Sequence, residues 1–158
     1  LSLASGCDPS TPAPVAQNNP SAATSTDDHD HPHSEGHMHA AGPHDGAVGD
    51  WGGGKFHVEF TVNHEMKEAT VYVLGSDEKT AAPVKTPDGK LLLTIKDPAF
   101  QVDLVASPME GEADGKSSRY VGKHDNLGTV QEFAGTISGE ADGTPYSGDF
   151  KEEPHDHE

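Results

Sequence analysis

The chain has 158 residues, of which only 32% are hydrophobic, and it contains 18 Gly and 12 Pro, so we expect only part of it to fold around a core. Its formal net charge of -17 argues against nucleic-acid binding, because polyanions are bound by basic patches and none is visible in the sequence. Lys and Arg are absent before Lys55, so His is the only side chain of the first 54 residues that can become cationic.

The chain begins with a short, mostly apolar segment that ends at its single cysteine, Cys7. Small residues directly precede Cys7, and leucines lie further back, as at the end of a bacterial lipoprotein signal peptide. We interpret residues 1–7 as a signal-peptide remnant with its lipobox, and Cys7 as the lipidated residue. The expected location is the cell envelope, anchored to a bacterial membrane, either in the periplasm or at the cell surface. The alternative is a cysteine without a function in a disordered end.

Residues 8–42 form a polar segment rich in Pro, Ala, Ser, Thr, Asn and His. It cannot bury enough apolar area to offset the entropy of ordering it, so we predict that it is disordered. A flexible coil of this kind would have an end-to-end distance of about 30–37 Å, which would hold the following domain clear of a membrane. A short disordered tail, acidic and containing His, is expected at residues 152–158.

Histidines are concentrated in and just after this segment, since seven of the eleven lie between positions 29 and 57. Neutral imidazole is the commonest protein ligand for Zn(II), Cu(II) and Ni(II), and the neighbouring carboxylates also suit these ions. The pattern predicts a chelating arm with moderate, exchangeable affinity. A solvated linker with no physiological ion is the alternative. The candidate metal ligands of the chain are His29, His31, His33, His37, His39, His44, His57 and Glu59.

From residue 56 onwards apolar and polar side chains alternate, which is typical of half-buried strands. Val58 and Phe60 would face a core, whereas His57 and Glu59 would project together from the opposite face, about 7 Å apart. We expect this second face to be exposed to solvent. A metal site formed by this pair together with His44 is the alternative.

Turn signals such as Pro-Asp-Gly and Asp-Gly separate further short strands. The expected fold is all-β: a small antiparallel β-sandwich, immunoglobulin-like or barrel-like, spanning residues 43–151. No helix of useful length is expected, and Trp51 should anchor the core or an edge. The other predicted strands are 69–74, 91–95, 100–105, 119–121, 130–137 and 145–150, and residues 108–118 are predicted to form a surface loop.

Six short motifs follow one another along this domain: Pro43–Gly46, Lys55–Phe60, Thr70–Leu74, Pro83–Val84, Phe133–Ile137, and Asp142–Tyr146 followed by Phe150. Their order resembles a domain of small bacterial lipoproteins that also occurs near the start of periplasmic adaptor subunits of heavy-metal efflux systems. That family has Gly where this chain has Asp45. The resemblance implies that His44, together with His57 and Glu59, carries a metal role, and that an efflux or other envelope protein is a partner.

The sequence contains no nucleophile elbow, zinc-protease motif, phosphate loop or paired catalytic cysteine. We therefore expect neither an enzyme nor an organic cofactor. The first hypothesis is a cell-envelope lipoprotein that binds Zn, Cu or Ni ions for buffering or transfer, with divalent metal ions and a lipid bilayer as its partners. The second is a structural or protein-binding β-sandwich module on a flexible tether, with no physiological metal.

Overall fold

Short strands make up most of residues 41–153, the part of the chain that the computed structural model describes. Two 3₁₀ turns, η1 (Pro87–Gly89) and η2 (Asp125–Gly128), lie between them and are the only helical elements of this part. The strands are β1 (Ala47–Trp51), β2 (Phe56–Asn63), β3 (Glu68–Leu74), β4 (Val84–Lys85), β5 (Lys90–Ile95), β6 (Phe100–Ala106), β7 (Lys116–Ser117), β8 (Arg119–Lys123), β9 (Ala134–Ala141) and β10 (Thr144–Lys151).

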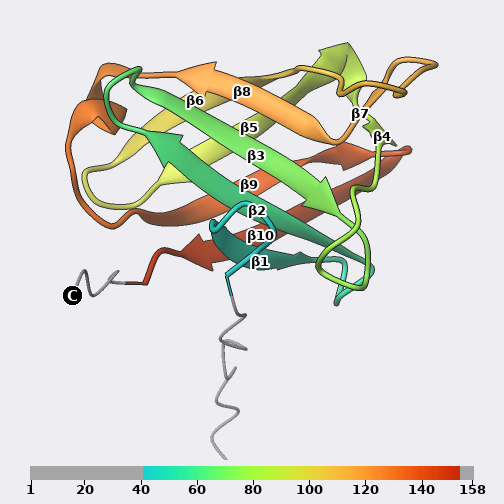
Figure 1. Cartoon of the computed structure of the whole chain (residues 1–158), viewed down its shortest axis with the longest axis horizontal. Helices are drawn as coiled ribbons and strands as arrows, with labels where there is room; N and C mark the ends of the chain where they lie inside the picture. The colour runs from blue at the N-terminus through green and yellow to red at the C-terminus, as the bar shows by residue number, and fades with distance from the viewer. Residues whose placement is uncertain (1–40, 154–158) are drawn as a thin grey trace, which may run out of the picture. The chain divides into compact units, whose positions relative to one another are not determined.

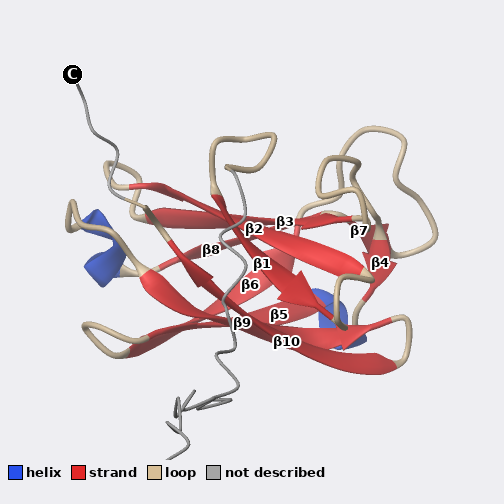
Figure 2. Ribbon diagram, turned by 90° about the horizontal axis from the view of Figure 1, so that it is seen from below, coloured by secondary structure: helices blue, strands red, loops and turns tan. Residues whose placement is uncertain are grey.

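Eight strands form one antiparallel sheet in the order β1-β2-β3-β8-β6-β5-β9-β10 (Figure 1). The sheet curls until its two edge strands, β1 and β10, lie against each other. A Cβ atom on Gly148 would lie 2.1 Å from the carbonyl oxygen of Asp50, and one on Gly49 would lie 2.4 Å from that of Asp149, so glycine is needed on both sides of this seam. The result is a nearly closed barrel (Figure 2), which confirms the all-β prediction in its barrel-like form.

The inward-facing side chains fill the barrel. Trp51 is fully buried, and its indole Nε1 donates a hydrogen bond to the carbonyl oxygen of Ile137 at 3.0 Å. The Phe60 ring stacks on Phe150, with centroids 4.4 Å apart, and meets Phe133 edge-on at 6.3 Å. Each large apolar side chain buried in this way stabilises the fold by about 1.5–3 kcal/mol. The prediction that Trp51 anchors the core is confirmed.

A two-stranded sheet of β4 and β7 lies beside the barrel. Tyr120 on β8 links the two sheets, because its buried hydroxyl lies 3.3 Å from both the Val84 carbonyl oxygen and Thr86 Oγ1. Burial raises the pKa of the Tyr120 phenol, so the hydroxyl keeps its proton and can donate one of these hydrogen bonds.

Most of the predicted strands are confirmed to within one or two residues, and three features differ from the predictions. The strand predicted at 130–137 begins only at Ala134. Before it, Val130 is 83% exposed, whereas the Phe133 side chain is buried in the core. The loop predicted at 108–118 contains β7. The third difference is that β1 and β4 form strands that the sequence pattern did not predict.

Candidate metal centre

His57 and Glu59 project from the outer face of β2, opposite the core-facing Val58 and Phe60. The alternation predicted for this strand is confirmed, but the prediction that its second face is exposed is wrong. His57 is 4% exposed and Glu59 is 0% exposed. The segment before β1 contacts Glu59, whereas Asp50 on β1 and the loop after β3 contact His57.

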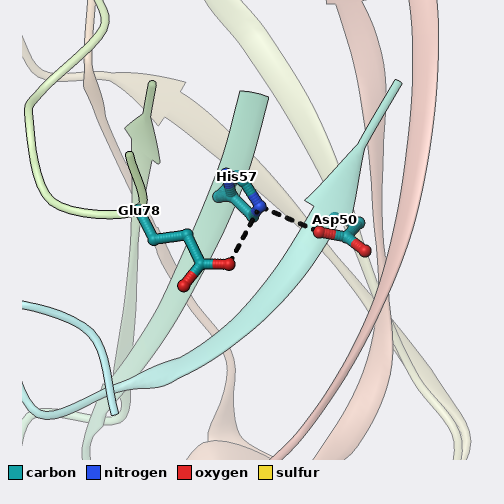
Figure 3. Close-up of side chains that lie close together, drawn as sticks. All are labelled: Asp50, His57 and Glu78. Carbon is teal, nitrogen blue, oxygen red and sulfur yellow. Dashed lines mark ion pairs between the residues drawn. The ribbon is translucent and has the colours of Figure 1, made fainter. Parts of the chain in front are cut away.

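The imidazole of His57 has a different partner at each nitrogen. Its Nδ1 lies 2.9 Å from the carbonyl oxygen of Gly75. A carbonyl oxygen only accepts hydrogen bonds, so we assign the Nδ1 position a proton. The Nε2 atom faces two carboxylates, with Asp50 Oδ1 at 2.9 Å and Glu78 Oε1 at 3.2 Å (Figure 3). In metal-binding histidines one nitrogen commonly donates to a backbone carbonyl while the other binds the ion. His57 has the carbonyl contact at Nδ1, and its Nε2 faces two carboxylates that could share an ion with it.

The strand register places Asp50 beside His57. These two residues are direct partners in the β1–β2 ladder, so their side chains leave the same face of the sheet. The β1–β2 turn is made by Gly52, Gly53 and Gly54, all at positive φ, a conformation that glycine adopts without the steric cost other residues incur.

The loop between β3 and β4 presents Glu78. Glu78 itself lies in the left-handed region at φ 61°, and its backbone N–H donates to the Gly75 carbonyl oxygen at 3.1 Å. The neighbouring Asp77 side chain accepts hydrogen bonds from the backbone N–H groups of Lys79, at 3.1 Å, and Thr80, at 2.9 Å. Hydrogen bonds from Thr80, first from its hydroxyl, lower the pKa of Asp77 to about 2. The Asp77 carboxylate thus organises the turn that carries Glu78 towards His57.

Asp50, His57 and Glu78 form the only group of three or more His, Cys, Asp or Glu residues with metal-ligand spacing in residues 41–153. Their three ligand atoms all lie within 4.8 Å of one another. One imidazole nitrogen and two carboxylate oxygens suit borderline divalent ions such as Zn(II), whereas Cu(I) prefers sulfur. Figure 3 shows both carboxylates pointing to the same nitrogen of His57.

Glu59 and His44 form a separate pair on the same face of β2. The Glu59 carboxylate accepts hydrogen bonds from the backbone N–H groups of His44, at 2.8 Å, and Gly46, at 2.9 Å, while His44 Nδ1 lies 2.8 Å from its second oxygen. The His44 ring also stacks on Tyr72, with centroids 3.6 Å apart. Asp45 has φ 59°, in the left-handed region of backbone conformation. This pair holds the segment before β1 against the barrel.

The structure therefore separates the site residues that the sequence predicted in this domain. The proposed combination of His44, His57 and Glu59 is not a single ligand group, because only His57 belongs to the three-residue group found in residues 41–153. The other two members, Asp50 and Glu78, are not among the ligands predicted from the sequence. The sequence does contain one indication for Asp50: the three glycines Gly52–Gly54 can form a turn, and a hairpin folded there places Asp50 opposite His57. Cys7, His29, His31, His33, His37 and His39 lie outside the described residues, as do residues 8–40 and 154–158 of the segments predicted to be disordered. The inner ends of those segments are described and hydrogen-bonded: the Gly42 N–H donates to the Gly46 carbonyl oxygen at 3.0 Å, and the Glu152 N–H donates to that of Phe133 at 2.9 Å.

Within residues 41–153, no helix is long and apolar enough to cross a membrane. No protein-family model matches the chain, and no curated protein or solved structure is significantly similar to it.

Proposed function

We propose that this chain is a cell-envelope lipoprotein that binds a divalent transition metal ion, Zn(II), Cu(II) or Ni(II), for buffering or transfer. One observation carries the metal-binding part of the proposal: Nε2 of the buried His57 faces both Asp50 and Glu78 while Gly75 holds the other ring nitrogen. Lipid anchoring through Cys7 and a partner in metal efflux rest on the sequence and on the family resemblance.

The charges of the group favour a cation. Two carboxylates that converge on one nitrogen repel each other unless a positive charge lies between them. A divalent ion bound to Nε2 and to one oxygen of each carboxylate is one way to supply that charge. The structure already holds the three ligand atoms close together, so binding requires little ordering of these side chains. The site should therefore compete for a divalent ion with the histidines of the N-terminal segment, which are spread along the sequence.

The test compares metal binding by the full chain with binding by the double variant Asp50→Asn/Glu78→Gln. Neutral amides keep the shape of these side chains but are poor metal ligands, so the variant tests ligation without removing bulk. In calorimetric titrations with Zn(II), we expect the tightest site to weaken by about a hundredfold, which corresponds to about 2.7 kcal/mol. Weaker binding by the other histidines should remain.

The matched control is Glu65→Gln/Asp88→Asn, which removes the same charge from two exposed residues outside the group. This control should bind Zn(II) as the unaltered chain does. If the tightest site survives in Asp50→Asn/Glu78→Gln, or is lost equally in the control, the proposal is wrong.

A further inference from the structure

The loop between β3 and β4 carries one of the three candidate ligands on a stretch of chain that is largely exposed. The residues on either side of Glu78, which are Ser76, Asp77, Lys79 and Thr80, are all exposed. Glu78 has φ 61°, a left-handed backbone conformation that is unfavourable for a residue with a Cβ atom. A loop with few buried apolar contacts opens easily unless hydrogen bonds hold one conformation. The position of the Glu78 carboxylate therefore depends on the hydrogen bonds that order this loop.

The backbone of the loop is linked to two of the ligands through one atom. The Gly75 carbonyl oxygen accepts a hydrogen bond from the Glu78 N–H at 3.1 Å, and the same oxygen lies 2.9 Å from His57 Nδ1. The Gly75 N–H donates to the Thr80 carbonyl oxygen at 2.9 Å, which closes the base of the loop. A change in the loop would therefore disturb the Glu78 backbone and the His57 ring together.

The Asp77 side chain holds the closed form of the loop. Its Oδ1 atom accepts from the backbone N–H groups of Lys79, at 3.1 Å, and Thr80, at 2.9 Å, while its Oδ2 atom accepts from the Thr80 hydroxyl. These bonds bracket Glu78, because Asp77 precedes it and their donors follow it. Asp77 is not one of the three residues of 41–153 whose ligand atoms converge. Its effect on a bound ion would therefore act through Glu78 or through its charge, and variants can separate these two routes.

We propose that Asp77, fixed by Thr80, is a positioning residue that sets the metal affinity of the centre by holding Glu78 in its ligating conformation. This inference rests on the proposed function, because it needs the ion at Asp50, His57 and Glu78. Without the Asp77 hydrogen bonds, metal binding would have to order the loop, and the entropy of that ordering would be lost from the affinity. Residues that orient metal ligands typically change affinity by about tenfold to a hundredfold when they are replaced.

The test measures Zn(II) affinity by calorimetric titration of the full chain, well below its unfolding temperature. Asp77→Asn should weaken the tightest site by about tenfold. The control is Asp88→Asn, which removes the same charge from another exposed aspartate with positive φ, at 54°, and should bind Zn(II) as the unaltered chain does.

Variants of Thr80 separate positioning from charge. Thr80→Val removes the hydroxyl donor without changing the charge, and it should weaken the tightest site by about threefold, the equivalent of part of one hydrogen bond. Thr80→Ser keeps the hydroxyl and should bind Zn(II) as the unaltered chain does. Loss of affinity in Asp77→Asn with none in Thr80→Val would assign the effect to charge and overturn the inference.

A double-mutant cycle with Glu78→Gln tests whether Asp77 acts through Glu78. Glu78→Gln leaves Asp50 and His57 as ligands, and in this background Asp77→Asn should change Zn(II) affinity by less than about twofold. It should still lower stability in urea. A purely structural role would lower stability in both backgrounds and leave Zn(II) affinity unchanged in both, whereas a tenfold loss of affinity in both would show that Asp77 does not act through Glu78. Either result would overturn the inference.

The double variant Asp50→Asn/Glu78→Gln separates failure of the inference from failure of the proposed function. If this variant loses the tightest site while Asp77→Asn binds Zn(II) as Asp88→Asn does, the metal centre stands and only the inference falls. If the tightest site survives the loss of both carboxylates, the proposed function itself is wrong.

Discussion

Asp50 lies directly opposite His57 in the β1–β2 ladder, and its Oδ1 atom is 2.9 Å from His57 Nε2. A cross-strand pair of this kind is fixed by backbone hydrogen bonds, so its geometry does not depend on a flexible loop. Glu78 supplies the third atom from the loop after β3, at 3.2 Å. Two of the three candidate ligands therefore lie on directly paired strands, and only Glu78 lies on a loop.

Metal ions should stabilise the folded chain. An ion that binds only the folded state, present at one hundred times its dissociation constant, adds about 2.7 kcal/mol to the free energy of unfolding. Thermal unfolding followed by circular dichroism should show a higher Tm with Zn(II), and a chelator should reverse the change. Asp50→Asn/Glu78→Gln should lose the site-dependent part of this increase, and an identical increase in that variant would be evidence against the site.

Glu59→Gln should destabilise the barrel. The buried Glu59 carboxylate accepts from two backbone N–H groups and faces His44 Nδ1 at 2.8 Å. The amide oxygen can still accept from both backbone N–H groups, but the NH2 group then faces His44 Nδ1 and the hydrogen bonds lose the charge of the carboxylate, at a cost of about 1–3 kcal/mol. Urea unfolding measures the change. Glu140→Gln, at an exposed position, is the control and should unfold as the unaltered chain does.

Gly148→Ala should weaken the seam between β1 and β10. The added Cβ would lie 2.1 Å from the Asp50 carbonyl oxygen and 2.8 Å from Trp51 Cδ1, so the strands would have to move apart. Overpacking of this kind typically costs about 1–3 kcal/mol. Gly75→Ala is the control, since its nearest neighbour would be Asp77 Oδ1 at 3.6 Å, an ordinary contact. Equal stability of the two variants in urea would show that the seam tolerates separation.

Asp77 should make the stability of the turn after β3 depend on pH. Its pKa is lowered from 3.8 to about 2, chiefly by the hydrogen bond from the Thr80 hydroxyl. A depressed pKa means that the ionised form stabilises the fold above about pH 4 and that this contribution is lost as the pH falls through about 2. The difference in unfolding midpoint between the unaltered chain and Asp77→Asn should therefore shrink between pH 5 and pH 2. A constant difference would contradict this assignment.

The sequence allowed prediction of the parts of the fold that alternation controls. Val58 and Phe60 face the core as their spacing indicates, and Val71 on the next strand is equally buried. Alternation reports which side chains share a face, but it does not report what covers the second face. For this reason alternation predicts an exposed face for His57 and Glu59, although both are buried.

The two other ligand candidates were missed for different physical reasons. Asp50 lies on β1, a five-residue strand interrupted by Gly49, which gives too short an alternating pattern to recognise. Glu78 depends on a turn organised by Asp77, and its direction follows from a left-handed backbone conformation. Such a conformation is a consequence of tertiary packing more than of local sequence preference, so the sequence pattern gave no indication of it.

Anomalous diffraction from crystals of the full chain grown with Zn(II) is the most direct test of the candidate metal centre. The proposal predicts a zinc peak about 2.0–2.2 Å from His57 Nε2 and from one oxygen each of Asp50 and Glu78. Zinc bound elsewhere, with no peak between these three residues, would contradict it.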